Sequence, residues 1–355
     1  MPIRKPDTTS GFAPHLPSGV DITGPSIAAL RLDGRLDRSL LSPPLHLVLL
    51  GIARVRNAVS SFRMEGERVD LDRARDLIES GRPETPSERG VIKLANAYRG
   101  LAEGHLPDLT ISGMERAHKM LFDGVLEPNL VGRLKTSQNV ITDVTETIVR
   151  FEPTPPERVR PELESLFSWA DKYAGTLLPP VAAAIFFAEF EAIHPFGNGN
   201  GRLGRYLNVA LLRKLGMKNA PLVPLDSRFF RTGDRYYDML ASTNSGESYY
   251  LWTRYYAREL QKAYSVAVSR GDLRRTTSRF SKNSTRSVLA WALSGSGSWF
   301  QRGDYPNRRG YSGPALWGAL QELVKGGVLE ERGEAKGRQY RVRAEFLAEV
   351  YSRLA

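Results

Sequence analysis

Residues 181–193 constrain the fold of this chain more than any other segment. They read Val-Ala-Ala-Ala-Ile-Phe-Phe-Ala-Glu-Phe-Glu-Ala-Ile, and Pro180 stands directly before them. Proline suits the first turn of a helix, where its missing N–H leaves no hydrogen bond unmade. A helix that is apolar almost all round needs neighbouring elements on every side. The segment therefore predicts a helix at the centre of a helical bundle.

The rest of the main body supplies segments with helical periodicity to surround this helix. The predicted helices are 44–62, 70–79, 87–103 (capped by Ser87), 110–121, 161–174, 201–215, 234–241 and 249–270. Residues 1–45 are rich in proline and glycine and lack a clear period, which predicts an irregular lead-in.

Residues 139–151 break the helical pattern and predict a β-hairpin. β-Branched residues, which favour strands, lie on both sides of Asp143: Val140, Ile141, Thr145, Thr147, Ile148 and Val149. Pro153, Pro155 and Pro156 then end the extended segment. The main body is therefore predicted to be mainly α-helical with one hairpin.

The last quarter of the chain has a different outline. Two predicted helices are followed by two strand-like segments that flank the turn 333–337: 284–293, 312–325, 328–332 and 338–342. Two helices and a basic hairpin are the outline of a winged helix-turn-helix unit. The predicted domains are an N-terminal extension (1–85), a central core (86–264) and a winged-helix-like domain (275–355).

The positive charge of the chain is concentrated in this tail. Of a net charge of +11, residues 265–355 contribute +8, from 16 Lys/Arg and 8 Asp/Glu. Such an excess suits a polyanion, although an ordinary solvated face also produces one. If the tail binds DNA, the basic residues that would contact phosphates are Arg308, Arg309, Lys325, Arg332, Lys336, Arg338, Arg341 and Arg343. The alternative is a module for protein contact or for a homodimer.

Composition excludes several classes of protein. The chain has no cysteine, which excludes disulfides, zinc ribbons and thiol nucleophiles, and its five histidines show no metal-ligand spacing. No apolar run approaches the roughly 18 residues of a membrane span. The first residues lack the apolar core of a signal peptide. We expect a cytoplasmic protein without a membrane partner.

The segment after the central helix has the residue types of a phosphate site with a base. Residues 194–205 read His-Pro-Phe-Gly-Asn-Gly-Asn-Gly-Arg-Leu-Gly-Arg. Gly199 and Gly201 let the backbone approach a ligand closely, and the N–H groups at a helix start bind anions. The two arginines lie three residues apart on one helical face, where they can fork onto phosphate oxygens. The histidine is placed to take a proton from an attacking hydroxyl.

This segment resembles the signature of the Fic family, HxFx(D/E)GNGRxxR. The matching residues are His194, Phe196, Gly199, Asn200, Gly201, Arg202 and Arg205. The resemblance covers residues 12–264 and implies an all-helical fold with one flap hairpin. It also implies that AMP passes from ATP to a protein hydroxyl, with His194 as general base. Asn200 and the Gly199–Gly201 amides would form the anion hole for the α- and β-phosphates, the two arginines would neutralise the β- and γ-phosphates, and Phe196 would be a core anchor.

One position departs from the signature. The family's acidic residue, which helps to hold Mg²⁺, is here Asn198. An amide oxygen can coordinate Mg²⁺ but carries no charge, and the ion prefers carboxylate and phosphate oxygens. The departure predicts weaker metal binding and leaves open which nucleotide group is moved.

A second resemblance lies near the N-terminus. Residues 61–66, Ser-Phe-Arg-Met-Glu-Gly, are similar to the family's inhibitory motif [S/T]xxxE[G/N]. The resemblance implies that Ser61, Glu65 and Gly66 form a brake in which Glu65 pairs with Arg205. A carboxylate there would repel a phosphate and occupy its partner.

Two further regions resemble parts of the family's site. Residues 132–138, the hairpin and residues 151–156 are similar to the flap, which would hold the target by strand addition. Ile148, Val149, Arg150 and Phe151 would border the target and the nucleotide. Tyr236, Tyr237 and Asn244 fall where the family places an adenine pocket. A plain surface hairpin, and a Tyr-Tyr pair that only packs in the core, are the alternatives.

The sequence therefore predicts a self-inhibited protein adenylyltransferase that uses ATP and Mg²⁺ and modifies a Ser, Thr or Tyr hydroxyl of a protein. One alternative is a DNA-binding regulator whose core senses nucleotides or is inactive. Another is an enzyme of the same family that transfers UMP, a phosphate or phosphocholine.

Overall fold

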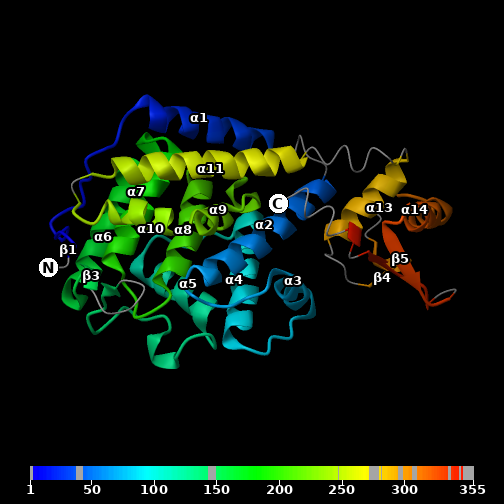
Figure 1. The fold of residues 1–355 in the computed structure, drawn as a ribbon, viewed down its shortest axis with the longest axis horizontal. Coiled ribbons are helices and arrows are strands. Elements are labelled where there is room, and N and C mark those ends of the chain that lie inside the picture. Colours follow the sequence, from blue (N-terminus) through cyan, green and yellow to red (C-terminus); the bar gives the residue numbers. More distant parts are fainter. Residues whose placement is uncertain are drawn as a thin grey trace. The chain divides into compact units, whose positions relative to one another are not determined.

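Helix α7 (Pro179–Ile193) is the central helix in the computed structural model, and its side chains are buried from Pro180 onward. Helices α1 (Val20–Arg35), α6 (Pro156–Tyr173) and α8 (Asn200–Lys214) pack against it (Figure 1). The prediction of a central apolar helix in a mainly helical fold is confirmed.

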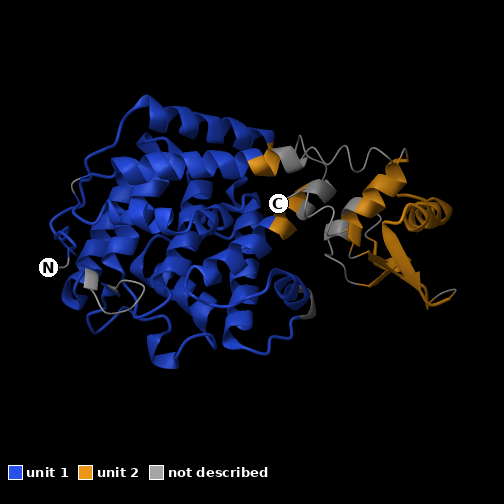
Figure 2. Cartoon of the chain, viewed as in Figure 1, with its two compact units in different colours: residues 1–35, 53–265 blue, residues 36–52, 266–355 orange. Residues whose placement is uncertain are grey.

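The structure describes residues 3–36, 43–142, 149–246, 248–271, 280, 282–294, 299–305, 310–334, 337–343 and 345–346. The chain forms two compact units, residues 1–35 with 53–265 and residues 36–52 with 266–355 (Figure 2). In this division, residues 53–85 belong to the same compact unit as residues 86–264, and the functional boundary at residue 85 stays a prediction.

The larger unit also contains most of helix α2 (Pro43–Arg63), which begins in the smaller unit, and of α11 (Tyr250–Gly271). Its other helices are α3 (Leu71–Ser80), α4 (Pro86–Glu103), α5 (Ile111–Phe122), η1 (Pro128–Leu130), η2 (Ala174–Thr176), η3 (Ala220–Leu222), α9 (Leu225–Thr232) and α10 (Asp234–Ala241). The cap of α4 is Thr85 rather than Ser87, because Thr85 and Glu88 form a reciprocal capping box.

The prediction of an irregular lead-in over residues 1–45 is wrong, since helix α1 lies there. Its buried face consists of Ile22, Ser26, Ala29 and Asp33. Two of these four are polar, so hydrophobic periodicity could not reveal the helix. Burial of Asp33 is tolerated because its carboxylate accepts hydrogen bonds from Asn219 N (3.0 Å) and Tyr264 Oη (2.8 Å).

The predicted hairpin is part of a three-stranded sheet in the order β1-β3-β2. Strand β2 (Ile141–Thr142) pairs antiparallel with β3 (Val149–Glu152), and β1 (Ile3–Arg4) pairs parallel with β3 from the other side. The edge of β3 that faces away from β2 is therefore already paired with the chain's own N-terminal strand. Residues 143–148 lie outside the described part.

A buried ion cluster anchors the N-terminal segment. The Lys5 ammonium lies 2.9 Å from Glu162 of α6 and 2.7 Å from Glu189 of α7, and all three side chains are almost fully buried. A buried charge is tolerated where it is paired. Because Lys5 N also donates to Glu152 O, the cluster ties the sheet to the central helix.

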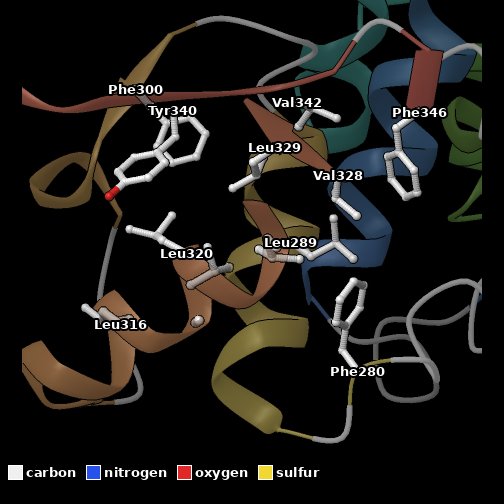
Figure 3. Packing of buried hydrophobic residues seen from close by; sticks show 14 of the residues in the cluster. Phe280, Leu289, Phe300, Leu316, Leu320, Val328, Leu329, Tyr340, Val342 and Phe346 are labelled. Atoms are coloured by element: carbon white, nitrogen blue, oxygen red, sulfur yellow. The ribbon is translucent and has the colours of Figure 1, made fainter. Parts of the chain in front are cut away.

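The smaller unit has its own core. Its elements are α13 (Asn283–Ser294), β4 (Phe300–Gln301), η4 (Arg302–Asp304), α14 (Gly313–Lys325), β5 (Leu329–Arg332) and β6 (Gln339–Val342). The strands form a sheet in the order β4-β6-β5. Leu329 and Tyr340 of this sheet belong to one hydrophobic cluster with Leu289 of α13 and Leu320 of α14 (Figure 3). Helices α13 and α14 and strands β5 and β6 lie where helices and strands were predicted, whereas β4 and η4 were not predicted. The winged-helix class stays a prediction.

The basic side chains of this unit are partly committed within it. Arg338 and Arg341 pair with Glu331 (3.3 Å) and Glu330 (2.6 Å). Arg332 and Arg341 also lie over the Trp299 ring. Lys325 and Arg343 are exposed, whereas Arg308, Arg309 and Lys336 lie outside the described residues. DNA binding stays a prediction.

Among the described helices, none is long and apolar enough to cross a membrane.

Candidate active site

His194 ends helix α7 in a left-handed conformation. Its φ is 50°, and it is the only described residue other than glycine with a positive φ. Its Nδ1 lies 3.2 Å from Glu191 O. A carbonyl can only accept, so this contact places the ring proton on Nδ1 and leaves the Nε2 lone pair available. Burial lowers the pKa of His194 to about 4, so the ring is neutral near pH 7 and can act as a base.

The start of helix α8 carries the glycines of the signature. Gly199 is its N-cap with φ 80°, and a Cβ there would lie 2.8 Å from the Phe122 ring. The Asn200 side chain is committed to the backbone of Phe196, accepting from its N–H (2.9 Å) and donating to its C=O (2.8 Å). Asn200 can therefore contribute to an anion hole only through its own N–H. Phe196 is fully buried, as expected of a core anchor.

Arg205 of α8 is held by the end of helix α2. Its Nε donates to Ser61 Oγ (2.7 Å), and its Nη2 donates to Ser61 O (3.0 Å) and to Glu65 Oε1 (2.7 Å). The predicted partners Ser61, Glu65 and Arg205 thus meet across 140 residues of sequence. Gly66 follows with φ 81°, which allows the chain to turn away after Glu65.

The Glu65 carboxylate occupies the space over the start of α8. A Cβ on Gly201 would lie only 2.4 Å from Glu65 Oε1. Burial opposes ionisation of this carboxyl, but the guanidinium groups of Arg205 and Arg202 outweigh it and hold the pKa of Glu65 below its ordinary value. An anion, Glu65, therefore already lies where the amides of the helix start favour one.

Arg202 lies between two aromatic rings. Its guanidinium carbon is 4.8 Å from the Phe62 ring centroid and 5.0 Å from that of Phe122, and the side chain is almost fully buried. One Nη donates to Asn198 Oδ1 (3.1 Å), whereas Nε has no hydrogen-bond partner among the described residues. The sequence analysis missed Phe62. Phe62 lies inside the 61–66 motif, so its location near the site could be predicted, but its contact with Arg202 could not.

The Asn198 side chain does not fit a magnesium ligand in this arrangement. Its Oδ1 accepts hydrogen bonds from Gly199 N (2.6 Å) and from Arg202, so both lone pairs are used. No group of three or more acidic or histidine side chains with the spacing of a metal site occurs among the described residues. Mg²⁺ binding by Asn198 stays a prediction that this geometry does not support.

The predicted adenine-pocket residues do not form one cluster. Tyr236 is 2% exposed and packs against Phe229 and Trp252, so it is a core residue and not a free stacking ring. Tyr237 is about half exposed, and its Oη donates to Met64 O (2.7 Å), the residue before Glu65. Asn244 instead lines a hollow of about 300 Å³ with Lys5 and Glu189.

The predicted flap residues are only partly described. Ile148 lies outside the described residues, and for Val149 and Arg150 only the backbone is described, as part of β3. Phe151 is 2% exposed, because alternate side chains of a strand point to opposite faces and this one points to the core. It is therefore not positioned to border a nucleotide in this arrangement.

Comparison with known proteins identifies this region. Residues 108–212 match the model of the Fic/DOC family. The chain carries a Fic domain. Protein adenylyltransferase fic-1 of Caenorhabditis elegans is 25% identical over 193 residues, which are 52% of this chain and 35% of that protein. A probable protein adenylyltransferase of Aquifex aeolicus is 32% identical over 97 residues, 27% of this chain and 28% of that protein. The chain thus spans about a third of these relatives' length.

The fold is also similar to that of Fic family proteins. A Fic family protein from Desulfovibrio desulfuricans G20 superposes with a TM-score of 0.65 at 21% identity, covering 94% of this chain and 99% of that one. At this level of identity the likeness concerns the fold alone. It supports the predicted Fic-type fold, whereas the functional roles of individual residues rest on the geometry above.

His118 is a residue of the Fic domain that the sequence analysis did not single out. It lies on α5, stacks on the Phe196 ring at 4.0 Å, and its Nε2 lies 3.0 Å from Asn198 O. Its Nδ1 accepts from Gly132 N (3.0 Å). The neutral ring thus joins the signature loop to the segment before the flap. A lone histidine in a helix gave no signal of this role.

Acidification is expected to destabilise the fold through His118, because only the neutral ring makes both bonds. Burial lowers the pKa of His118 from 6.5 to about 4. The unfolded chain therefore binds the proton more readily, so the contribution of this ring is intact above pH 6.5 and is lost as the pH falls toward 4. At 1.36 kcal/mol per pKa unit the loss is about 3 kcal/mol. Urea unfolding at pH 7 and pH 4.5 measures it.

The matched variant is His118→Gln, which keeps one donor and one acceptor but does not titrate. It should be less stable than the parent at pH 7 and should lose less stability between the two pH values. An equal loss in both proteins would show that the acid sensitivity arises from other groups.

Proposed function

We propose that this chain is a self-inhibited protein adenylyltransferase that transfers AMP from ATP to a Ser, Thr or Tyr hydroxyl of a protein. The observation that carries the proposal is the pairing of a neutral His194 with an anion site that Glu65 fills. The names of the relatives, protein adenylyltransferases, support this choice of group.

In this reaction the hydroxyl oxygen forms a bond to the α-phosphorus, and the bond from that phosphorus to the oxygen bridging to the β-phosphate breaks. The proton passes to Nε2 of His194, and pyrophosphate leaves. Arg202 and Arg205, with the N–H groups at the start of α8, would neutralise the phosphates. Catalysis would rest on positioning and charge, without a covalent intermediate.

Labelled ATP tests the proposal. The Glu65→Gly variant is incubated with a protein mixture and either α-labelled or γ-labelled ATP, with Mg²⁺ or Mn²⁺ in the buffer. Adenylyl transfer deposits the α-label on protein and not the γ-label, whereas phosphoryl transfer gives the reverse. Asn198→Asp in the same background should increase the α-label at low Mg²⁺, because a carboxylate binds the ion more strongly than an amide.

The alternatives give different results. Transfer from UTP, or of a γ-phosphate, would keep an enzyme but change the group that it moves. No label from any nucleotide, in any variant or metal, would overturn the transferase proposal and favour a nucleotide-sensing regulator.

A further inference from the structure

A second segment of the chain is bonded to the turn that carries His194. Residues 134–139, which lead into the flap, lie against residues 193–196. Leu134 forms an isolated antiparallel bridge with Phe196, and Lys135 N donates to Pro195 O (2.9 Å). This contact joins two parts of the larger unit that are about 60 residues apart in sequence.

Two side chains complete the contact. The Lys135 ammonium donates to Asn139 Oδ1 (2.6 Å) and lies 3.5 Å from Ile193 O. Asn139 Nδ2 in turn donates to Phe196 O (3.0 Å). Lys135 is 6% exposed, and a lysine is rarely buried to this extent unless its charge is paired. The carbonyls on both sides of His194 are thus held from one segment.

The backbone of His194 explains why such a contact is needed. A non-glycine residue in the left-handed region is strained, and the strain persists only where the surroundings over-determine it. Here the carbonyl of the preceding residue, Ile193, and the carbonyls of the two following residues all receive hydrogen bonds from the 134–139 segment. The same turn brings Nδ1 to Glu191 O, which fixes the tautomer.

We propose that Lys135 and Asn139 are positioning residues for His194, and that they hold its turn in the geometry in which the ring acts as a base. The proposal rests on the proposed function for its catalytic meaning. Burial is the main cause of the low pKa of His194. The charge of Lys135 lowers this pKa further, whereas the Glu191 carbonyl and the Glu65 carboxylate favour the protonated ring.

The test uses the full chain in the Glu65→Gly background with four substitutions: Lys135→Met, Lys135→Arg, Asn139→Ala and, as control, Lys93→Met. Lys93 likewise donates to a backbone carbonyl, that of Met120, but on α4, outside the site. Two quantities are measured, the rate of transfer from saturating ATP and the titration of His194 by NMR of ring-labelled histidine, assigned with His194→Ala.

We expect Lys135→Met to lower the maximal rate about 10- to 100-fold, as misplacement of a reacting group does, with the Kd for ATP unchanged within about twofold. The His194 titration should move to higher pH. Lys135→Arg should restore most of the rate, because it keeps the charge and the donors. Asn139→Ala should lower the rate about tenfold while leaving the charge of Lys135 in place.

A rate and a His194 titration that Lys135→Met leaves unchanged would overturn the proposal. If Lys135→Met fails to fold, as judged by circular dichroism, Asn139→Ala decides in the same way. If the parent shows no transfer at all, the proposed function fails, and the NMR titration still tests whether Lys135 and Asn139 hold the histidine.

Discussion

Replacing Glu65 by Gln should tighten ATP binding about 10- to 100-fold, which corresponds to roughly 1.4–2.8 kcal/mol. In the parent, the carboxylate is bonded to Arg205 and covers Gly201, so an incoming phosphate must displace it. The apparent affinity is reduced by the fraction of molecules in which the site is open. Removing the charge also removes the repulsion between the carboxylate and the ligand, and Glu65→Gly, which removes the side chain too, should tighten binding further.

Glu65→Gln should destabilise the protein when no nucleotide is bound. Arg205 is buried and loses its ion pair with Glu65, since Gln can accept a hydrogen bond but carries no charge, so the unfolding temperature should fall by a few degrees. ATP should then raise it more in the variant than in the parent, because a ligand stabilises in proportion to its occupancy. Isothermal titration calorimetry and thermal unfolding, with and without ATP, measure both effects.

Glu67→Gln is the matched control for this experiment. Glu67 belongs to the same segment, but its carboxylate accepts from Ser87 Oγ (2.7 Å), and it acts on Arg202 of α8 only through a longer-range electrostatic interaction. It should change ATP affinity by less than about twofold. Equal affinities in the parent, Glu65→Gln and Glu65→Gly would contradict a brake at this position.

The residues of the site that the sequence revealed are those in two short motifs. Residues 194–205 and 61–66 each resemble a family motif of fixed spacing. The contact that this resemblance implies between them, Glu65 with Arg205, is present at 2.7 Å. The central helix was predictable for a similar reason, because its apolar residues are contiguous. A contiguous apolar segment and a motif of fixed spacing can both be recognised within a short stretch of sequence, whereas the contact between the two motifs spans 140 residues and was implied only by the resemblance.

The residues that the sequence did not reveal depend on tertiary contacts. Phe62 acts on Arg202 only because helix α2 lies beside α8, and Lys135 reaches the His194 turn only because the segment before the flap folds back on it. Helix α1 was hidden because half of its buried face is polar. Tyr236 was assigned to an adenine pocket by the resemblance to the family, with core packing as the alternative, and in the structure it is buried against Trp252.

Replacing His194 by Asn should lower the rate of transfer about 10²- to 10⁴-fold, the usual contribution of a general base. Asn is the sharper choice than Ala, because it tolerates the left-handed conformation that this position requires. The phosphate groups would contact α8 and not the imidazole, so the Kd for ATP should stay within about threefold. The experiment uses the Glu65→Gly background, in which the predicted brake is removed, and measures single-turnover rates at saturating ATP.

The pH dependence of the unsubstituted base gives a second test of the same assignment. Burial lowers the pKa of His194 to about 4, and only the neutral ring can accept a proton. Glu65 raises this pKa, so the rate in the Glu65→Gly background should be level from pH 6 to 8 and should fall only as the pH approaches about 4 or lower. An exposed histidine would instead give a midpoint near 6.5. His105→Ala, at an exposed histidine paired with Glu103, should leave the rate and its pH dependence unchanged. If His194→Asn leaves the rate unchanged, another group accepts the proton. The reaction that Glu65→Gly activates would then need no base at position 194.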